Sequence, residues 1–339
     1  MMEKVVLGLS GGVDSAVAAA LLRERGFEVH GLFLELGLGG EEAAQRVADS
    51  LKIPLHLAHE KAAFERTVCE YFKGEYRAGR TPIPCVVCNP AIKFRALAGY
   101  ADEIGAAYLA TGHYARTARD EKGRVLLLRG VSAKDQSYML HRLPRAVLAR
   151  CIFPLGEAES KHGVRERAAR EGIPCAQAKD SMDICFIPDG DWCSWLERSG
   201  VRLPEGNFVD ETGRVLGRHG GVHRYTVGQR KGLGVSAPGR LFVTALRPET
   251  AEVVLSLKDP LRGEIEVDGV HYCAPEYAEG GAFPCEVRVR FSQRADRAVV
   301  YPSGDVARIV FDSPVRAPAP GQAAVFYDGD VVIGGGFIR

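Results

Sequence analysis

The chain of 339 residues lacks an apolar run long enough to cross a membrane, because no hydrophobic stretch approaches the roughly 18 residues that a spanning helix needs. Its first residues also lack a basic segment followed by a long apolar core and a small-residue cleavage site, so we expect no export. The composition, 46% hydrophobic and 26% charged, is that of a globular protein. The sequence therefore predicts a cytoplasmic protein of two or three domains.

A cysteine pattern typical of a disulfide framework is also missing. The nine cysteines are scattered along the chain, and an odd number in a long chain without an export signal argues against such a framework. We expect most of them to be small buried apolar side chains and one or two to be reactive.

Acidic residues are absent between Thr212 and Pro248, although the net charge of the whole chain is only +1. The same stretch holds seven cations: Arg214, Arg218, Arg224, Arg230, Lys231, Arg240 and Arg247. This local excess suits contact with phosphates. The alternative is a basic surface that balances acidic ones elsewhere, and the sequence leaves both interpretations open.

The opening segment KVVLGLSGGVDSAVAAALLRERG predicts a strand, a loop and a helix. The apolar, β-branched run Val5–Leu9 is typical of a buried parallel strand. The Ala- and Leu-rich run Ala16–Arg25 predicts a helix that ends at Gly26, and Glu28–Leu34 predicts a second strand. This βαβ order indicates a doubly wound α/β sheet, in which ligands bind at the carboxyl ends of the strands.

The loop between this strand and helix has the features of an anion site. Gly11 and Gly12 allow a tight turn with exposed N–H groups, Ser10 and Ser15 add hydroxyl donors, and the helix points its positive end at the same place. The loop is neither a Walker loop nor G-x-G-x-x-G, and a plain turn is the alternative. Ser-Gly-Gly-x-Asp-Ser resembles the pyrophosphate loop of the N-type ATP pyrophosphatases, which cleave ATP between the α- and β-phosphates and leave AMP on a substrate oxygen.

Two cysteines lie in Pro-bounded segments downstream. The prolines of TPIPCVVCNPAIKF predict a non-helical loop up to Asn89, which would cap a helix starting at Pro90. Cys88 would then lie beside a helix N-terminus and near Lys93, both of which lower a thiol pKa. Cys185 lies in a second predicted loop, with charged neighbours on its N-terminal side: Lys179, Asp180 and Asp183.

For each cysteine alone, a buried structural role is the alternative. Two of them downstream of an adenylation loop suit persulfide chemistry, in which one thiol transfers sulfur and the other resolves the product by forming a disulfide.

Short alternating apolar segments recur from Glu264 to the end of the chain, separated by turn residues. They predict a C-terminal antiparallel β-barrel. The alternation in CEVRVRF places Arg288 and Arg290 on one face of a strand. The segment Gly217–Gly234, rich in Gly, Arg and His, suits a loop that follows a phosphate backbone.

Seven strings, in order along the whole chain, resemble those of the bacterial tRNA-uridine 2-sulfurtransferase family, the tRNA 2-thiouridylases. They are GLSGGVDSAV, CNPAIKF, ATGHYAR, KDQSYML, KDSMDICFIP, GRHGGVHRYTVGQRKGLG and PGQAAVFYDGDVVIGGG. The resemblance implies ATP-dependent thiolation of the wobble uridine of tRNA. ATP with Mg²⁺ would adenylate the uracil C2 oxygen, Cys185 as a persulfide would deliver sulfur from a donor protein or relay, and Cys88 would form a disulfide with Cys185.

The resemblance also implies an organisation and a set of site residues. A catalytic domain would span residues 1–195, a small basic central domain 196–260, and a tRNA-gripping barrel 261–339. The residues that would bind the nucleotide are Gly8, Leu9, Ser10, Gly11, Gly12, Val13, Asp14, Ser15, Leu34 and Gly112. Those that would contact tRNA are His113, Lys134, Asp135, Gln136, Arg290, Phe291 and Gln322, with a solvated surface as the alternative for several of them.

One departure from the family pattern concerns Cys85. Many members carry an Asp three residues before the first catalytic cysteine, proposed as an acid/base, so that role is in doubt here. A further hypothesis is that Cys85, Cys88 and Cys185 hold three corners of an iron–sulfur cluster. The alternatives to thiolation are a small-molecule adenylating ligase, which would not need paired cysteines, and a non-catalytic tRNA-binding protein.

Overall fold

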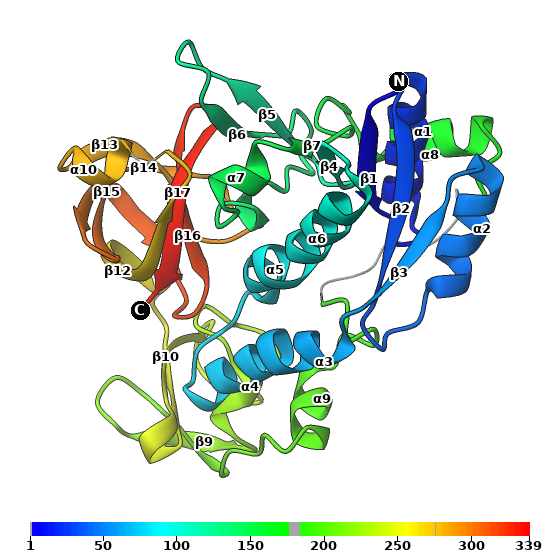
Figure 1. Ribbon diagram of the computed structural model, residues 1–339. Coiled ribbons are helices and arrows are strands. Elements are labelled where there is room, and N and C mark those ends of the chain that lie inside the picture. Colours follow the sequence, from blue (N-terminus) through cyan, green and yellow to red (C-terminus); the bar gives the residue numbers. More distant parts are fainter. Residues whose placement is uncertain (1, 176–183, 275) are drawn as a thin grey trace. The chain divides into compact units, whose positions relative to one another are not determined.

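A parallel sheet forms around the apolar opening of the chain, as the computed structural model shows (Figure 1). The structure describes residues 2–175, 184–274 and 276–339. They fall into two compact units, which are treated separately. The first unit comprises Met1–Val68, Cys85–Phe186 and Gly329–Ile333; the second comprises Cys69–Pro84, Ile187–Asp328 and Gly334–Arg339.

The first unit is built on a five-stranded parallel sheet with the order β3-β2-β1-β4-β7. Its strands are β1 (Lys4–Gly8), β2 (Glu28–Glu35), β3 (Leu55–His59), β4 (Tyr108–Ala110) and β7 (Cys151–Ile152). Val5, Val6 and Leu7 are fully buried, as expected for a strand covered on both faces. The order reverses between β1 and β4, and ligands bind beside such a switch point.

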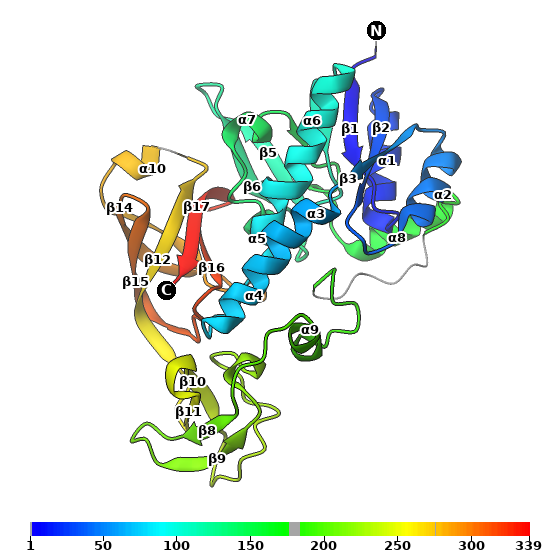
Figure 2. The same cartoon turned by 60° about the horizontal axis from the view of Figure 1, so that its bottom comes forward.

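Helices cover both faces of this sheet (Figures 1 and 2). On one face lie α1 (Val13–Glu24), α2 (Glu41–Leu51) and α8 (Lys161–Arg170), and on the other lies α6 (Phe94–Ile104). Ala16, Ala18 and Ala19 are fully buried, because their small side chains let α1 pack closely against the strands. The predicted doubly wound α/β class is confirmed.

Shorter elements complete the helical and hairpin parts of the chain. They are α3 (Lys61–Phe64), η1 (Glu65–Cys69), α4 (Glu70–Arg77), α5 (Pro84–Cys88), η2 (Asn89–Lys93), β5 (Ala115–Arg119), β6 (Val125–Arg129), η3 (Ser137–Met139) and α7 (Arg145–Leu148). No helix among the described residues combines the length and apolar character that crossing a membrane requires.

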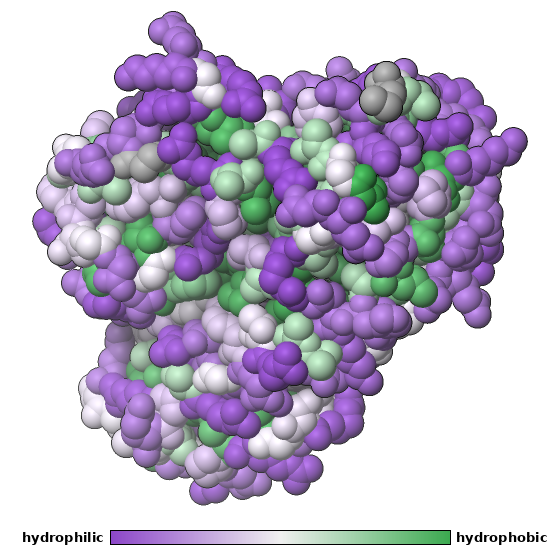
Figure 3. Space-filling model, viewed as in Figure 1, coloured by the Kyte–Doolittle hydropathy of each residue, from purple (hydrophilic) through white to green (hydrophobic). Residues whose placement is uncertain are grey.

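The second unit contains a small mixed sheet with the order β10-β11-β8-β9 (Figure 2). Its elements are α9 (Trp192–Arg198), β8 (Gly206–Val209), β9 (Val215–His219), η4 (Val222–Arg224), β10 (Phe242–Arg247), η5 (Pro248–Thr250) and β11 (Glu252–Ser256). Phe208, Val243 and Val253 form its buried core. Hydrophilic residues cover most of the face of this module that Figure 3 shows.

The C-terminal part of the chain forms a closed, six-stranded antiparallel barrel. The order is β12-β15-β14-β13-β16-β17, and β17 closes the barrel by pairing with β12. The strands are β12 (Leu261–Tyr272), β13 (Phe283–Arg288), β14 (Asp296–Ser303), β15 (Val306–Arg316), β16 (Ala323–Asp328) and β17 (Val331–Ile338), with α10 (Glu276–Glu279) between β12 and β13. The predicted C-terminal β-barrel is confirmed, and the same sheet continues from β17 into the hairpin β6-β5.

Candidate active site

The loop between β1 and α1 is held in shape by its two serines. The Ser15 hydroxyl accepts a hydrogen bond from the Ser10 N–H (3.2 Å) and donates one to the Gly12 carbonyl (2.9 Å). Leu9 and Val13 are buried, so they contribute backbone groups only. Gly12, which has no side chain, directly precedes α1. The first N–H groups of this 12-residue helix therefore face the loop, as an anion site requires.

Glycine is required at position 11 for two reasons. Its φ is +78°, a conformation that L side chains rarely adopt. A Cβ there would also lie 2.7 Å from the backbone nitrogen of Ala44 and 2.8 Å from the carbonyl carbon of Ala43. The start of α2 is thus packed directly on the loop.

Asp14 is held by two residues from distant parts of the first unit. One carboxylate oxygen pairs with the Lys161 ammonium (2.5 Å), and the other accepts a hydrogen bond from the Tyr114 hydroxyl (2.8 Å). Lys161 is the first residue of α8 and is only 15% exposed. No sequence pattern pointed to Lys161, because its partner lies 147 positions away.

The segment after β4 touches the same loop. A Cβ on Gly112 would lie 2.8 Å from the carbonyl carbon of Asp14 and 2.9 Å from the Ser15 nitrogen, so backbone meets backbone here. Leu34 is half-buried and lies near the carboxyl end of β2, the strand next to β1 in the sheet. The structure thus places Gly112 against the predicted nucleotide loop, while its predicted contact with a nucleotide remains a prediction.

His113 follows Gly112 and is neutral at physiological pH. Burial holds the pKa of His113 well below its usual range, and the positive charge of Lys93 acts in the same direction. The His113 Nδ1 lies 2.7 Å from the Thr111 hydroxyl, and the imidazole ring stacks near Phe94. These contacts fix the ring orientation at the end of β4.

The expected non-helical loop before Asn89 is wrong. The chain is helical from Pro84, through α5 and the π-helical turn η2, into α6. Proline fits the first position of α5, and the wider turn of η2 accommodates Pro90, which has no N–H to donate. Asn89 is buried inside this helical run and donates to the Met139 carbonyl (2.9 Å) instead of capping a helix. Cys88 is therefore not beside a helix N-terminus.

Cys85 and Cys88 lie on the same side of α5, one turn apart. Both are half-buried, whereas Cys185 is exposed in a turn, as predicted. Burial raises the pKa of the Cys85 thiol, and Lys93 opposes this shift. Lys179, Asp180 and Asp183, the charged residues predicted to flank Cys185, lie outside the described residues.

Cys185 lies within electrostatic reach of Cys85 and Lys93. Although the Cys185 side chain is exposed, the protein around its thiol partly desolvates it and raises its pKa; Cys85 raises the pKa further, and Lys93 lowers it. The ring of Phe186, next in sequence, packs edge-on against Phe64 at 5.6 Å and is buried, which anchors the turn. Both cysteine segments therefore belong to the first unit, and they influence each other electrostatically.

Lys93 connects the parts of this site. Its charge acts on His113, on Cys85 and on Cys185. The contacts then continue from His113 through its neighbour Gly112 to Asp14 and Ser15. The sequence suggested Lys93 only as a neighbour of Cys88. The structure gives it a wider role, because its charge also acts on His113 and on Cys185, and its side chain is half-buried.

The three cysteines do not fit a preformed cluster site. Within the described ranges, which include Cys85, Cys88 and Cys185, no group of three or more His, Cys, Asp or Glu side chains is arranged to hold a metal ion. No disulfide joins Cys88 and Cys185, both described residues, in this structure, and the pairing implied by the resemblance stays a prediction.

The predicted RNA contacts of the first unit differ in accessibility. Lys134 is exposed. Asp135 is buried, and its carboxylate accepts hydrogen bonds from the N–H groups of Gly130 and Ser137 (both 3.0 Å). The Gln136 side chain accepts one from the Tyr114 N–H (3.1 Å). Asp135 and Gln136 thus organise the loop that presents Lys134.

The predicted RNA contacts of the second unit are all half-buried. The Arg290 guanidinium donates to the carbonyls of Ala317 (3.0 Å) and Val227 (2.6 Å), and the Gln322 amide donates to that of Thr81 (3.0 Å). The neighbouring Phe291 ring packs against the Arg288 guanidinium at 5.2 Å. Their contact with RNA remains a prediction.

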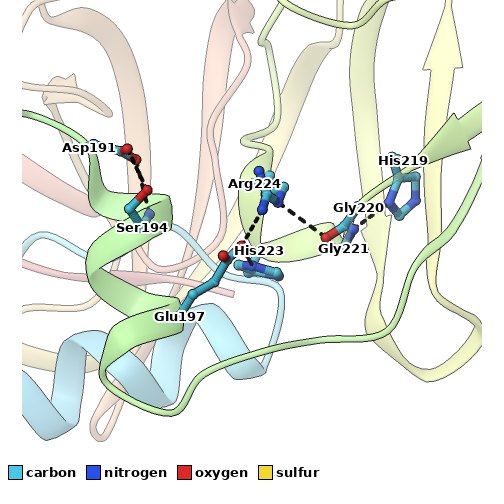
Figure 4. A network of polar contacts seen from close by, with 8 residues as sticks. All are labelled: Asp191, Ser194, Glu197, His219, Gly220, Gly221, His223 and Arg224. Atoms are coloured by element: carbon cyan, nitrogen blue, oxygen red, sulfur yellow. Dashed lines mark hydrogen bonds and ion pairs between the residues drawn. The ribbon is translucent and has the colours of Figure 1, made fainter.

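The GRHGGVHR string uses several of its polar groups internally (Figure 4). Arg224 pairs with Glu197 of α9 and donates to the Gly220 carbonyl (3.2 Å), and His223 lies 3.5 Å from the same Glu197 carboxylate. His219 accepts from the Gly221 N–H (3.1 Å). Burial lowers the pKa of both His219 and His223. This half of the Gly217–Gly234 segment holds the module together.

Three domain families match the chain in succession. Residues 3–189 match the tRNA methyl transferase HUP domain, residues 195–257 the tRNA methyl transferase PRC-barrel domain, and residues 262–338 the aminomethyltransferase beta-barrel domain.

Curated relatives match it over nearly its full length. The tRNA-specific 2-thiouridylase MnmA of Lachnoclostridium phytofermentans is 41% identical over 357 residues, covering 99% of both chains. That of Carboxydothermus hydrogenoformans is 43% identical, covering 99% of this chain and 98% of the relative. The tRNA-specific 2-thiouridylase MnmA of Moorella thermoacetica is 42% identical, and the match covers 98% of this chain and 99% of the relative.

Proposed function

The chain belongs to the tRNA-specific 2-thiouridylase family, and from this we propose that it replaces the C2 oxygen of the wobble uridine of tRNA by sulfur, at the cost of ATP. The observation that carries the proposal is that Gly112 lies against the 10–15 loop, while Lys93 acts electrostatically on His113, Cys85 and Cys185. We therefore propose that the loop binds the nucleotide and the cysteines carry the sulfur within the first unit, and that the reaction takes place in the cytoplasm with its tRNA.

The first half-reaction uses the 10–15 loop. We propose that MgATP binds with its phosphates over the N–H groups at the start of α1. The uracil C2 oxygen attacks the α-phosphorus, the bond between the α- and β-phosphates breaks, and pyrophosphate leaves. AMP is then attached to the C2 oxygen, which turns a poor leaving group into a good one.

The second half-reaction uses the cysteines. A donor persulfide first transfers its outer sulfur to Cys185, whose exposed position suits this exchange. The terminal sulfur of the Cys185 persulfide attacks C2 and displaces AMP. The Cys88 thiolate then attacks the Cys185 sulfur, which breaks the S–S bond, releases 2-thiouridine and leaves a Cys88–Cys185 disulfide. A dithiol reductant must supply two electrons to restore both thiols.

Lys93 supports this step electrostatically. The surrounding protein raises the pKa of the Cys85 and Cys185 thiols, and Lys93 opposes both shifts. The persulfide anion that forms on Cys185 lies within reach of the Lys93 charge. A positive group here favours the anionic nucleophile, in the way that basic neighbours activate other thiolates. No step passes through a metal cluster, which the cysteine geometry does not fit.

The proposal is tested by incubating the protein with MgATP, a cysteine persulfide donor and unmodified tRNA with a wobble uridine. We expect the digested RNA to contain 2-thiouridine by mass spectrometry, together with AMP and pyrophosphate. AMP formed without tRNA and without thiolation would instead indicate a small-molecule ligase. Binding of tRNA with no AMP at all would indicate a non-catalytic RNA-binding protein.

The Lys161–Asp14 ion pair gives a separate prediction. Without the Lys161 ammonium, the Asp14 carboxylate beside the loop is uncompensated and repels the ATP phosphates. We expect Lys161→Ala to raise the KM for ATP about tenfold, which corresponds to about 1.4 kcal/mol, and to leave the KM for tRNA unchanged. His162→Ala is the matched control, because His162 is the next residue of α8 and is 81% exposed. Equal ATP KM values for the two variants would contradict this role for Lys161.

A further inference from the structure

The structure separates the seven cations of the acid-free stretch into two groups. Four of them pair with carboxylates that lie outside the stretch: Arg214 with Asp210 (3.2 Å), Arg218 with Glu205 (3.6 Å), Arg247 with Glu252 (3.0 Å), and Arg224 with Glu197. For the other three, Arg230, Lys231 and Arg240, no carboxylate of the described residues lies within 4.0 Å. The second group therefore carries net charge that the protein does not balance locally.

The three cations of the second group, Arg230, Lys231 and Arg240, lie around the same surface hollow. They are exposed and line a hollow of about 280 Å³ in the second unit. A water molecule occupies about 30 Å³ in the liquid, so the hollow has room for a phosphate group with several waters. All three lining residues carry a positive charge and none is aromatic, so the hollow offers cationic groups to a phosphate and no aromatic ring to a base.

The loop that presents the cations is fixed by hydrogen bonds. The Gln229 side chain accepts from the Thr226 N–H (3.1 Å) and donates to the Lys231 carbonyl (3.1 Å), so it spans the turn. The Gly228 N–H donates to the Val243 carbonyl (2.7 Å), and the Val243 N–H donates to the Gln229 carbonyl (2.9 Å), which ties the turn to β10. The backbone that carries Arg230 and Lys231 is therefore ordered before any ligand binds.

We propose that Arg230, Lys231 and Arg240 form a backbone-phosphate site for the tRNA substrate, separate from the residues that recognise the target base. The inference rests on the proposed function, which supplies an RNA substrate. Contacts of this kind position a nucleic acid without reading its sequence. The loss of positive charge should therefore weaken binding of all tRNAs alike and should reduce its dependence on salt.

The test compares two triple variants. R230A/K231A/R240A empties the hollow of charge. R214A/R218A/R247A removes the same number of cations from the same stretch, but each of these has its own carboxylate partner. Binding of unmodified tRNA is measured by fluorescence anisotropy between about 50 and 200 mM salt. Over this range the affinity contributed by phosphate contacts falls steeply in nucleic-acid complexes. Circular dichroism checks that both variants are folded.

We expect the hollow variant to bind tRNA at least about tenfold more weakly at the lowest salt. The plot of log K against log salt should become less steep by about 2 to 3 units of slope, since each of the three lost phosphate contacts contributes roughly 0.7 to 0.9. Its kcat at saturating tRNA should stay within about twofold, with the loss confined to KM. The paired-cation control should change the slope by less than about 1. The double variant R230K/R240K should keep the wild-type slope, because charge alone is needed.

Two results would overturn the site: a hollow variant with wild-type affinity and slope, or equal losses in both triple variants. Either result leaves the proposed function intact if wild type still forms 2-thiouridine. Conversely, a wild type that binds tRNA but never thiolates it would end the proposed function, and the salt comparison would still decide the phosphate site.

Discussion

Cys185→Ser is expected to abolish 2-thiouridine formation, by at least about 10³-fold, while tRNA-dependent conversion of ATP to AMP continues. A serine oxygen cannot carry a persulfide sulfur, so no nucleophile reaches C2. In the proposed mechanism the adenylation step depends on other residues, in the loop at 10–15 and at Gly112, and serine at position 185 removes none of their contacts. Mass spectrometry of the tRNA and chromatography of AMP measure the two half-reactions separately.

Cys88→Ser should also stop multiple turnover, but for a different reason. The terminal sulfur can still attack C2, so we expect a tRNA covalently bound to Cys185, visible as a protein–RNA adduct on a non-reducing gel. Cys193→Ser, a half-buried cysteine of the second unit, is the control and should keep wild-type activity. Wild-type thiolation by either the Cys88 or the Cys185 variant would refute the assigned cysteine roles.

The opening of the first unit could be predicted from the sequence because its signals are local. The strand Lys4–Gly8 differs by one residue from the predicted Val5–Leu9. The helix starts at Val13 rather than Ala16, since helix N-termini are defined by the turn before them, and here that turn is made by glycines without a capping side chain. The alternating segments after Glu264 gave the barrel for the same reason, because a period of two is visible within each strand.

The helical run Pro84–Ile104 could not be predicted in the same way. Three prolines in one segment indicate a loop when only local propensity is considered. The tertiary structure overrides this preference, because Ile92 and Phe94 are buried in the first unit and the π-helical turn η2 accommodates Pro90. The error moved Cys88 from a helix N-terminus to the interior of a helical segment, so its activation cannot come from a helix dipole.

Contacts between residues far apart in the chain also could not be predicted from the sequence. The Lys161–Asp14 contact and the division of the basic stretch into paired and unpaired cations depend on residues brought together by folding. Composition revealed the excess of positive charge between Thr212 and Pro248, and left a phosphate contact and a balanced surface equally open. The structure separates the two interpretations by residue: carboxylates balance Arg214 and Arg247, whereas no carboxylate of the described residues lies within 4.0 Å of Arg230 or Arg240, for which we propose phosphate contact.

Gly112→Ala is expected to remove both half-reactions, in contrast to Cys185→Ser. The added Cβ would lie 2.8 Å from the Asp14 carbonyl carbon, 2.9 Å from the Ser15 nitrogen and 3.0 Å from the Asp14 carbonyl oxygen. These are backbone atoms, so relief requires the 10–15 loop itself to shift, and displacing catalytic groups by about 1 Å can cost on the order of 10² in rate. We expect tRNA-dependent AMP formation to fall at least about 100-fold, with thiolation falling in parallel.

Gly99→Ala is the matched control for this substitution. Gly99 lies exposed within α6, and a Cβ there meets nothing within 4 Å. Alanine at such a helical position should stabilise the fold by about 0.5–1 kcal/mol and leave both half-reactions unchanged. The same methyl group thus has opposite consequences at the two sites, because only Gly112 presses on the loop. If Gly112→Ala retained AMP formation and lost thiolation alone, the contact between Gly112 and the loop would not govern nucleotide activation.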